Sequence, residues 1–288
     1  MTRVTTVQLM GGLGNQLFQL GFGLAIPQAD EREIQFSFNE LKLNGRRVPR
    51  RDFDVKDLLD ESEITYYGLA RILLYGLSSR VSSQYVVRER RFGESLLNEV
   101  TSKTRFVMGY FQTHELMRAV WPQFVARIRK AGGKWSQILE PAKDYCALHV
   151  RLGDIAQFGQ ARDFHGLTHP EYFERALDEV CKRQLVSTVK VVSDEPQAAK
   201  LLLNELGLER RFELIFSDGK SSVDDLATMA QASAVVASNS TFSWWGGFMS
   251  EQLHGALVVV PVPWFASNEV NTRALIPDHW ISVKRQVL

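Results

Sequence analysis

Apolar and polar positions alternate regularly between residues 145 and 261. Short apolar runs, typical of buried strands, are separated by longer segments in which apolar residues recur at helical spacing. The strands predicted in this way cover residues 145–150, 188–192, 212–216, 232–237 and 256–261. Strands that alternate with helices predict an α/β fold in which a parallel sheet is built by right-handed crossovers.

Capping sequences mark where the helices between these strands begin. Residues 168–171 have the spacing of a capping box, with Thr168 as the cap and a proline in the first turn, and predict a helix to about residue 182. Asp194 and Ser222 open the next two helices. The acidic pair Asp224-Asp225 is expected to stabilise the second of these through the helix dipole.

The first half of the chain has a weaker pattern. Its predicted strands are residues 4–9, 34–38 and 106–111, its predicted helices are 17–25 and 115–130, and residues 58–100 have a mostly helical pattern. The glycine pair Gly132-Gly133 suits a helix stop and the start of a connection between domains. We therefore predict two domains, residues 1–135 and 136–288.

Composition narrows the class of protein. A hydrophobic content of 45% and a charged content of 23% are ordinary for a globular chain, and a net charge of +1 gives no sign of a nucleic-acid partner. Cys146 and Cys181 lack the spacing of a zinc site and are expected to be reduced thiols. No apolar run reaches eighteen residues and the N-terminus does not resemble a signal peptide, so we expect a cytoplasmic protein.

A glycine-rich turn follows the first predicted strand. Residues 11–16, which include Gly12, Gly14, Asn15 and Gln16, would let the backbone approach a ligand closely. The turn is not a dinucleotide-binding fingerprint, because Leu17 occupies the third glycine position, and it is not a phosphate-binding loop of the Gly-Lys-Ser/Thr type.

The stretch of residues 237–247 lies where a predicted strand ends and a helix begins. Ser240 or Thr241 can cap that helix, and the N–H groups of its first turn, with the positive end of the helix dipole, form a site for an anion such as phosphate. The alternative is a well-capped helix whose two tryptophans, Trp244 and Trp245, belong to the core.

Two further strand ends carry side chains suited to the same ligand. His149 and Arg151 point to one face, and an arginine there can bind a diphosphate through charge-assisted hydrogen bonds. Arg151 could instead pair with Asp154 or Asp194 in a structural network, and His149 could be an ordinary buried histidine. Asp194 could accept hydrogen bonds from ribose or guanine, or cap its helix.

The strand ends lack an Asp-x-Asp motif of the kind that holds a divalent metal beside a nucleotide diphosphate. Arg151 and a helix N-terminus can neutralise a diphosphate by themselves. We therefore predict a metal-independent site with no cofactor.

Several motifs together resemble glycosyltransferase family 11, the α-1,2-fucosyltransferases. Residues 11–19 resemble the N-terminal signature of that family, and residues 149–154 resemble the His-x-Arg-Arg-x-Asp motif that it shares with α-1,6- and protein O-fucosyltransferases. Residues 193–196, 238–247 and 276–281 resemble the later motifs. The match spans nearly the whole chain in the same order.

The resemblance implies a GT-B-like α/β fold, with two facing Rossmann-like domains that have parallel sheets. The N-terminal domain would receive a galactose-containing glycan, and the C-terminal domain would hold the donor, GDP-fucose. By motif position, Arg151 would contact the donor diphosphate, the loop of Ser240, Thr241 and Phe242 would close on the phosphates, and His149 and Asp194 would lie near the nucleotide. Gly12, Gly14, Asn15, Gln16 and His165 would line the cleft.

The implied activity is that of an inverting galactoside α-1,2-fucosyltransferase of bacterial glycan biosynthesis. Asp154 is the candidate general base, with Asp163 and His165 in reserve, although Asp154 could instead orient Arg151. A lipid-linked acceptor would bring the protein to the inner face of the membrane. Leu152 replaces the second arginine of the motif, and this motivates an alternative, a nucleotide-binding or regulatory protein with a degenerate transferase site.

Overall fold

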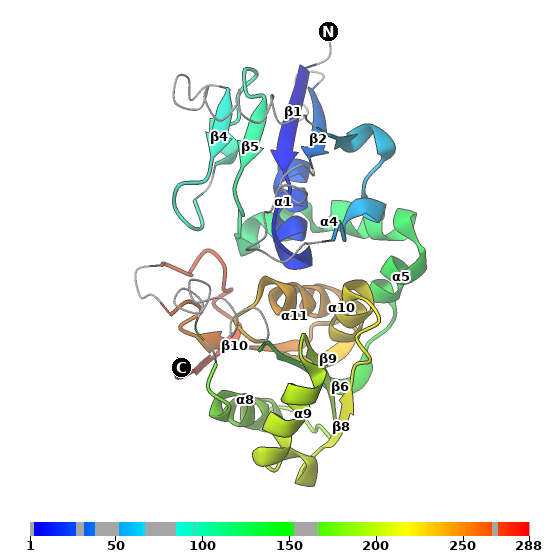
Figure 1. Ribbon diagram of the computed structural model, residues 1–288, viewed down its shortest axis with the longest axis vertical. Coiled ribbons are helices and arrows are strands. Elements are labelled where there is room, and N and C mark those ends of the chain that lie inside the picture. The colour runs from blue at the N-terminus through cyan, green and yellow to red at the C-terminus, as the bar shows by residue number, and fades with distance from the viewer. Residues whose placement is uncertain are drawn as a thin grey trace. The chain divides into compact units, whose positions relative to one another are not determined.

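A computed structural model describes residues 3–26, 32–37, 52–66, 85–94, 96–152, 166, 168–266 and 270–287. The chain divides into two compact units, each with its own sheet (Figure 1). The first unit consists of Met1–Ala131 with Asn271–Pro277, and the second of Gly132–Val270 with Asp278–Leu288.

The first unit contains a parallel five-stranded sheet in the order β3-β2-β1-β5-β4. Its strands are β1 (Arg3–Gln8), β2 (Arg32–Ser37), β3 (Ile64–Thr65), β4 (Val86–Arg88) and β5 (Phe106–Met108). Two long helices, α1 (Leu13–Ala25) and α4 (His114–Ala131), pack against each other. Gly21 permits this approach, because a Cβ atom there would lie 2.5 Å from the sulfur of Met117.

The mostly helical pattern predicted for residues 58–100 is wrong for the described part of that range. The structure has short strands there and the 3₁₀ turns η1 (Lys56–Leu58), η2 (Glu61–Glu63) and η3 (Leu97–Glu99). Helix α1 also begins earlier than predicted, at Leu13, so that Gly14, Asn15 and Gln16 lie in its first turn.

The second unit contains a parallel six-stranded sheet in the order β11-β10-β9-β6-β7-β8. Its strands are β6 (Lys143–Val150), β7 (Thr188–Ser193), β8 (Glu213–Phe216), β9 (Ala232–Val236), β10 (Leu257–Val262) and β11 (Ile281–Lys284). Its helices are α5 (Gly133–Ser136), α8 (Glu171–Cys181), α9 (Pro196–Glu205), α10 (Ser222–Ala230) and α11 (Thr241–His254), with 3₁₀ turns η4 (Gln137–Leu139) and η5 (Leu208–Arg210). The predicted α/β class, with two units built on parallel sheets, is confirmed.

Helices cover both faces of the second sheet, with α8 and α9 on one side and α10 and α11 on the other (Figure 1). The side chains of β6 point alternately toward these two layers of helices. Cys146, Leu148 and Val150 pack into the core beneath α8 and α9, whereas Tyr145 and Ala147 pack toward α10. By the same alternation, His149 faces the side of α10 and α11.

Helix α11 is buried along most of its length, from Ser243 to Ser250. Trp244 stacks on Phe248 with ring centroids 5.0 Å apart, and the adjacent glycine pair lets the helix approach its neighbours. A Cβ atom on Gly246 would lie 2.6 Å from the Cβ atom of Met229 in α10, and one on Gly247 would lie 2.8 Å from Val258 in β10. Close packing on two sides thus holds α11 against α10 and β10.

Two predicted helix starts are wrong in detail. Helix α8 begins at Glu171 with Pro170 at the N-cap position and no side-chain cap, and the hydroxyl of Thr168, two residues before the N-cap, donates to Asn239. Helix α9 begins after Glu195 at its N-cap position, so Asp194 is not the cap. Both residues instead lie at the carboxyl edge of the sheet, where the parallel strands β6, β7 and β9 all end.

Candidate active site at the carboxyl edge of the second sheet

A hydrogen-bonded turn of residues 238–240 connects β9 to α11. Ser240 is the N-cap, and its Oγ accepts from the backbone N–H of Phe242 at 3.3 Å. The Ser240 N–H donates to the Ser238 carbonyl at 2.8 Å, and the Ser243 hydroxyl donates to the same carbonyl at 3.0 Å. These bonds hold the first turn of α11, whose N–H groups attract anions, at the sheet edge.

Arg151 reaches this turn from the neighbouring strand β6. Its Nη1 donates to Ser240 Oγ at 3.2 Å, so the guanidinium lies at the N-terminus of α11. Arg151 is partly exposed, so a ligand at this edge can reach its guanidinium. A fixed positive charge and a helix N-terminus at one point can together bind a phosphate or diphosphate.

His149 is buried beneath the turn and is 5% exposed. Its Nδ1 lies 2.6 Å from Ser238 Oγ, and its ring centroid lies 5.4 Å from that of Phe242. Burial lowers the pKa of His149 from 6.5 to about 3, and the nearby charge of Arg151 adds to the effect. The imidazole is therefore neutral at pH 7 and supports the turn through a hydrogen bond, without contributing charge.

Asp194 is exposed at the end of β7. Its Oδ1 accepts from the backbone N–H of Leu152 at 2.9 Å, which ties β7 to the residue after Arg151. The Leu152 side chain packs against the apolar core. The structure therefore brings His149, Arg151, Asp194 and the turn to one edge of the sheet, and their contacts with a ligand remain predictions.

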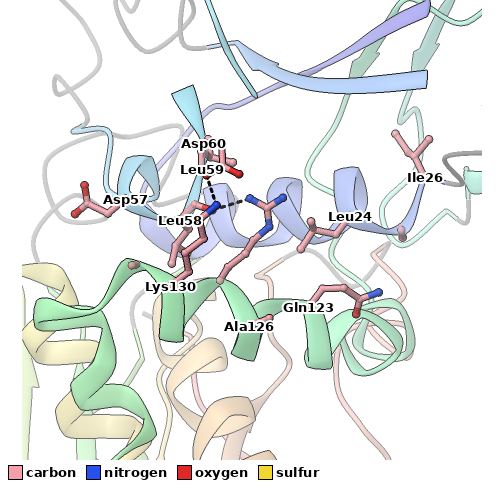
Figure 2. Close-up of a pocket in the computed structure, with 12 residues that line it drawn as sticks. Leu24, Ile26, Asp57, Leu58, Leu59, Asp60, Gln123, Ala126 and Lys130 are labelled. Carbon is pink, nitrogen blue, oxygen red and sulfur yellow. Dashed lines mark hydrogen bonds and ion pairs between the residues drawn. The ribbon is translucent and has the colours of Figure 1, made fainter. Parts of the chain in front are cut away.

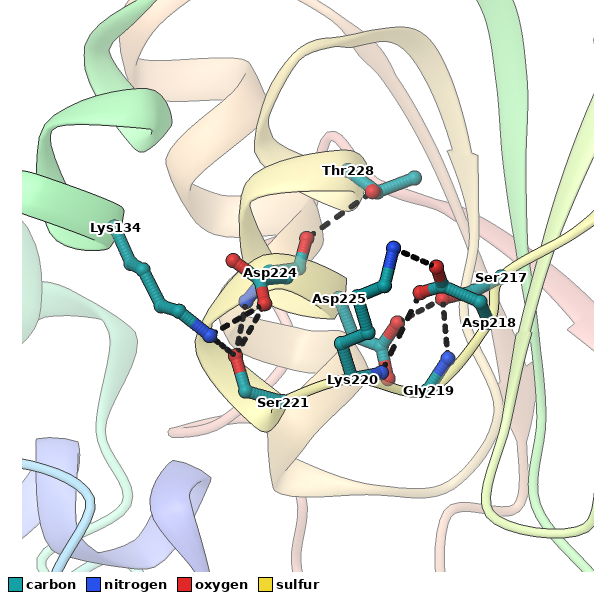
Figure 3. A network of polar contacts seen from close by, with 9 residues as sticks. All are labelled: Lys134, Ser217, Asp218, Gly219, Lys220, Ser221, Asp224, Asp225 and Thr228. Atoms are coloured by element: carbon teal, nitrogen blue, oxygen red, sulfur yellow. Dashed lines mark hydrogen bonds and ion pairs between the residues drawn. The ribbon is translucent and has the colours of Figure 1, made fainter.

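The loop between β8 and α10 brings Asp225, for which the sequence predicted only a helix-dipole role, to the carboxyl edge of the sheet. Figure 3 shows the polar contacts of this loop. Ser221 caps α10, and Asp224 pairs with Lys134 at 2.9 Å. Asp225 instead bonds the hydroxyl of Ser217, which directly follows β8. Burial raises the pKa of Asp225 above its usual value, and the Ser217 hydrogen bond opposes the shift. A carboxylate in this position can accept hydrogen bonds from a nucleobase or a sugar.

The glycine turn of the first unit is well ordered by amide side chains. Gln16 is buried, and its Nε2 donates to the carbonyls of Gly11 at 3.0 Å and Asp52 at 2.8 Å. The Oδ1 of Asn15 accepts from Gln112 at 3.0 Å. Gly11 has a φ of 78°, and a Cβ atom there would lie 2.5 Å from the Asn15 amide nitrogen. Gln16 therefore has a structural role, and Asn15 is held in place by a residue that the sequence pattern did not identify.

Three predicted residues, Asp154, Asp163 and His165, lie outside the described residues. Within the described residues, no three His, Cys, Asp or Glu side chains are grouped as metal ligands, and no helix is long and apolar enough to cross a membrane.

A groove of about 880 Å³ lies in the first unit between the C-terminal halves of α1 and α4 (Figure 2). Arg127 forms a two-pronged ion pair with Glu63 at 2.6 and 2.7 Å, and Lys130 pairs with Asp60 at 2.5 Å. The groove lies at the opposite end of α1 from the glycine turn. Its paired charges have a structural role, so we assign no ligand to it.

The chain resembles known glycosyltransferases along its length. The family model "Glycosyl transferase family 11" matches residues 81–284. The Escherichia coli protein alpha-1,2-colitosyltransferase is 22% identical, over 98% of this chain and 99% of that protein. The Escherichia coli O-antigen biosynthesis glycosyltransferase WbnK is 24% identical, over 96% and 99%.

Solved structures that resemble this chain have a lower sequence identity to it than these two proteins do. A crystal structure of NodZ alpha-1,6-fucosyltransferase soaked with GDP-fucose is 12% identical, over 86% of this chain and 93% of that chain, with a TM-score of 0.47. The family model, in contrast, matches the sequence from the described strand β4 to the last strand of the second unit. The chain belongs to glycosyltransferase family 11.

Proposed function

We propose that this glycosyltransferase moves fucose from GDP-β-L-fucose to the 2-hydroxyl of a galactoside, with inversion to an α linkage. One observation supports this most: Arg151 donates to the N-cap of α11, and so joins a cation to a helix N-terminus at the carboxyl edge of a parallel sheet. Ligands of such sheets bind at this edge, and a nucleotide diphosphate is an anion of suitable charge.

The proposed reaction breaks the bond between the fucosyl anomeric carbon and the diphosphate oxygen. The electron pair leaves with GDP, while the galactoside oxygen forms the new bond from the opposite face. Arg151 and the first-turn N–H groups of α11 would stabilise the charge that develops on the departing diphosphate. His149, neutral and bonded to Ser238, would keep the turn in position.

The galactoside hydroxyl loses its proton as it attacks, so the site needs a base. Asp154 is the first candidate, since it lies three residues after Arg151 in the chain, and Asp163 and His165 follow as reserves. We propose that the second unit holds the donor and the first unit the acceptor. In this account the enzyme works in the cytoplasm, and a lipid-linked acceptor would bring it to the inner face of the membrane.

A second donor comes from the relative named as an alpha-1,2-colitosyltransferase. Colitose lacks the 3-hydroxyl of fucose, and a GDP sugar of either kind would present the same diphosphate to Arg151. A different class of function, nucleotide binding without transfer, is motivated by Leu152, whose side chain packs into the core where the family motif has a second arginine.

Turnover assays separate these functions. The protein would be incubated with GDP-fucose or GDP-colitose and a panel of galactosides, and GDP release would be measured against reactions without acceptor. The proposal predicts acceptor-dependent GDP release with GDP-fucose. Faster release with GDP-colitose would reassign the donor, and GDP binding without turnover on either donor would favour the nucleotide-binding alternative.

A further inference from the structure

A buried arginine near the C-terminus, Arg285, lies directly after β11. Its side chain is fully enclosed, with an exposed fraction of 2%. A guanidinium loses favourable hydration when it is buried, and burial lowers the pKa of Arg285 to about 10. Such a group requires specific hydrogen bonds, so the atoms that it contacts indicate what it organises.

Its guanidinium joins two segments that lie far from it in the sequence. Nε donates to the carbonyl of Pro263 at 2.7 Å, and Nη2 donates to the carbonyl of Trp264 at 3.1 Å. Nη1 donates to the carbonyl of Gly166 at 3.0 Å and to Thr168 Oγ1 at 3.1 Å. The loop after β10 and the segment before α8 are thus held to one side chain.

Thr168 connects Arg285 to the turn of residues 238–240 through two hydrogen bonds. Its hydroxyl accepts from Arg285 and donates to the Oδ1 of Asn239 at 3.2 Å. The Nδ2 of Asn239 donates to the Gly166 carbonyl at 3.3 Å, the same carbonyl that Arg285 contacts. All three side chains are buried, at 2%, 7% and 4% exposed. We call these residues, Arg285, Thr168 and Asn239, the Arg285 relay.

Asn239 stands between the two serines that organise the candidate active site. Ser238 bonds His149 and Ser240 bonds Arg151, so Asn239 links the relay to the backbone between these two contacts. Hydrogen bonds on the opposite side of the turn, from Ser243, hold its backbone to α11. The turn is therefore held from α11 on one side and from the relay on the other.

The C-terminal segment has backbone bonds of its own, which are independent of the guanidinium. The Arg285 N–H donates to the Val262 carbonyl at 2.8 Å, the His169 N–H donates to the Gln286 carbonyl at 3.1 Å, and Val287 forms an antiparallel bridge with Thr168. The side-chain hydrogen bonds that connect Arg285 to Asn239 are thus additional to the backbone hydrogen bonds that anchor the C-terminal segment.

We propose that Arg285 is a positioning residue for the donor site, which sets the diphosphate-binding turn through Thr168 and Asn239. This inference rests on the proposed function, because it assumes that the turn binds the diphosphate of a GDP sugar. It assigns a role in donor binding to the last strand and the residues that follow it, which the motifs of the sequence did not place in the site.

The test is calorimetric titration of GDP into the full-length protein and its variants, at a temperature where each is folded. Thr168→Val removes the hydroxyl that links Arg285 to Asn239 while keeping the shape of the side chain. We expect it to weaken GDP affinity by about 5- to 10-fold, since it removes both buried hydrogen bonds of that hydroxyl, the one from Arg285 and the one to Asn239. Thr168→Ser, which keeps the hydroxyl, should bind GDP nearly as well as the unsubstituted protein.

Two further variants separate positioning from general stability. Thr188→Val removes an exposed hydroxyl that bonds Glu213 on the neighbouring strand, and it should not change GDP affinity. Arg285→Lys should weaken affinity, and the double variant with Thr168→Val should bind about as weakly as the weaker single variant, because both changes break one relay.

The outcomes distinguish the inference from the function on which it rests. GDP binding by Thr168→Val that equals that of the unsubstituted protein would overturn the relay alone. Fully additive losses in the double variant would also overturn it, because they would mean that the two residues act separately. Failure of the unsubstituted protein to bind GDP would overturn the proposed function, and the inference with it.

Discussion

At the scale of single residues, His149 and Arg151 take opposite electrostatic roles although one residue separates them. His149 lies under the turn, where burial lowers its pKa to about 3 and keeps it neutral. Arg151 lies past the end of β6, partly exposed, and keeps its charge beside the N-terminus of α11. The alternation of the strand was enough to predict that they share a face, but the burial that keeps His149 neutral depends on α11.

Replacing Arg151 by alanine tests the charged member of this pair. We expect Arg151→Ala to lower kcat/KM by about 10²- to 10³-fold, a loss of about 3–4 kcal/mol, because a charge-assisted contact to the departing diphosphate disappears. Steady-state kinetics would measure the loss, and circular dichroism would show that the fold is kept. Arg175→Ala, an exposed arginine on α8 in the same unit, should be nearly as active as the unsubstituted protein.

The lowered pKa of His149 predicts how stability depends on pH. Above about pH 6.5 the histidine is neutral in both the folded and the unfolded chain, so its contribution to stability is complete. Between pH 6.5 and about 3 only the unfolded chain takes up the proton, so the free energy of unfolding falls by up to about 1.4 kcal/mol per pH unit. Urea titrations from pH 7.5 to 5 should show this decline. A His149→Gln variant with an equally steep decline would contradict the assignment.

At the scale of elements, one residue at the start of α11 combines a stability role with a proposed role in the donor site. Ser240 Oγ accepts from both the Phe242 N–H and Arg151, so it caps the helix and also holds the guanidinium. The sequence predicted that Ser240 or Thr241 would cap this helix, because small hydroxyl residues followed a buried strand, and the structure identifies Ser240 as the cap. The capping box predicted at Thr168 failed, since its hydroxyl is used by Asn239 and Arg285, contacts that local sequence does not encode.

A comparison of two helix caps separates these roles. Ser240→Ala and Ser221→Ala each remove the serine cap of a helix in the second unit, and each should lower the free energy of unfolding by about 1 kcal/mol. Ser240→Ala should also weaken GDP binding more than Ser221→Ala does, because only Ser240 bonds Arg151. Equal GDP affinities of the two variants, measured by calorimetry, would remove Ser240 from the donor site.

At the scale of the whole molecule, the two units differ in how much of their secondary structure could be predicted from the sequence. In the second unit both faces of the sheet are covered by helices, so its central strands are continuous apolar runs that stand out between amphipathic helices. In the first unit the outer strands are only two or three residues long, too short to produce a pattern. The Arg285 relay joins residues more than a hundred positions apart, and only the fold brings them together.

The composition of the site predicts that the enzyme works without a divalent metal. Positive charge near the proposed diphosphate comes from Arg151 and from the first turn of α11, which can together neutralise it. Initial rates should therefore be retained in excess EDTA. Loss of turnover in EDTA that is restored by Mg²⁺ or Mn²⁺ would contradict this account of the diphosphate site.

The most direct test of the central claim is the structure of the reaction product. The protein would be incubated with GDP-fucose and a β-galactoside, and the purified product would be analysed by NMR for its linkage and anomeric configuration. The account predicts one fucosyl residue in α configuration on the 2-hydroxyl of galactose, formed together with one equivalent of GDP. A β-linked product, a fucose on another hydroxyl, or GDP release without a fucosylated product would contradict it.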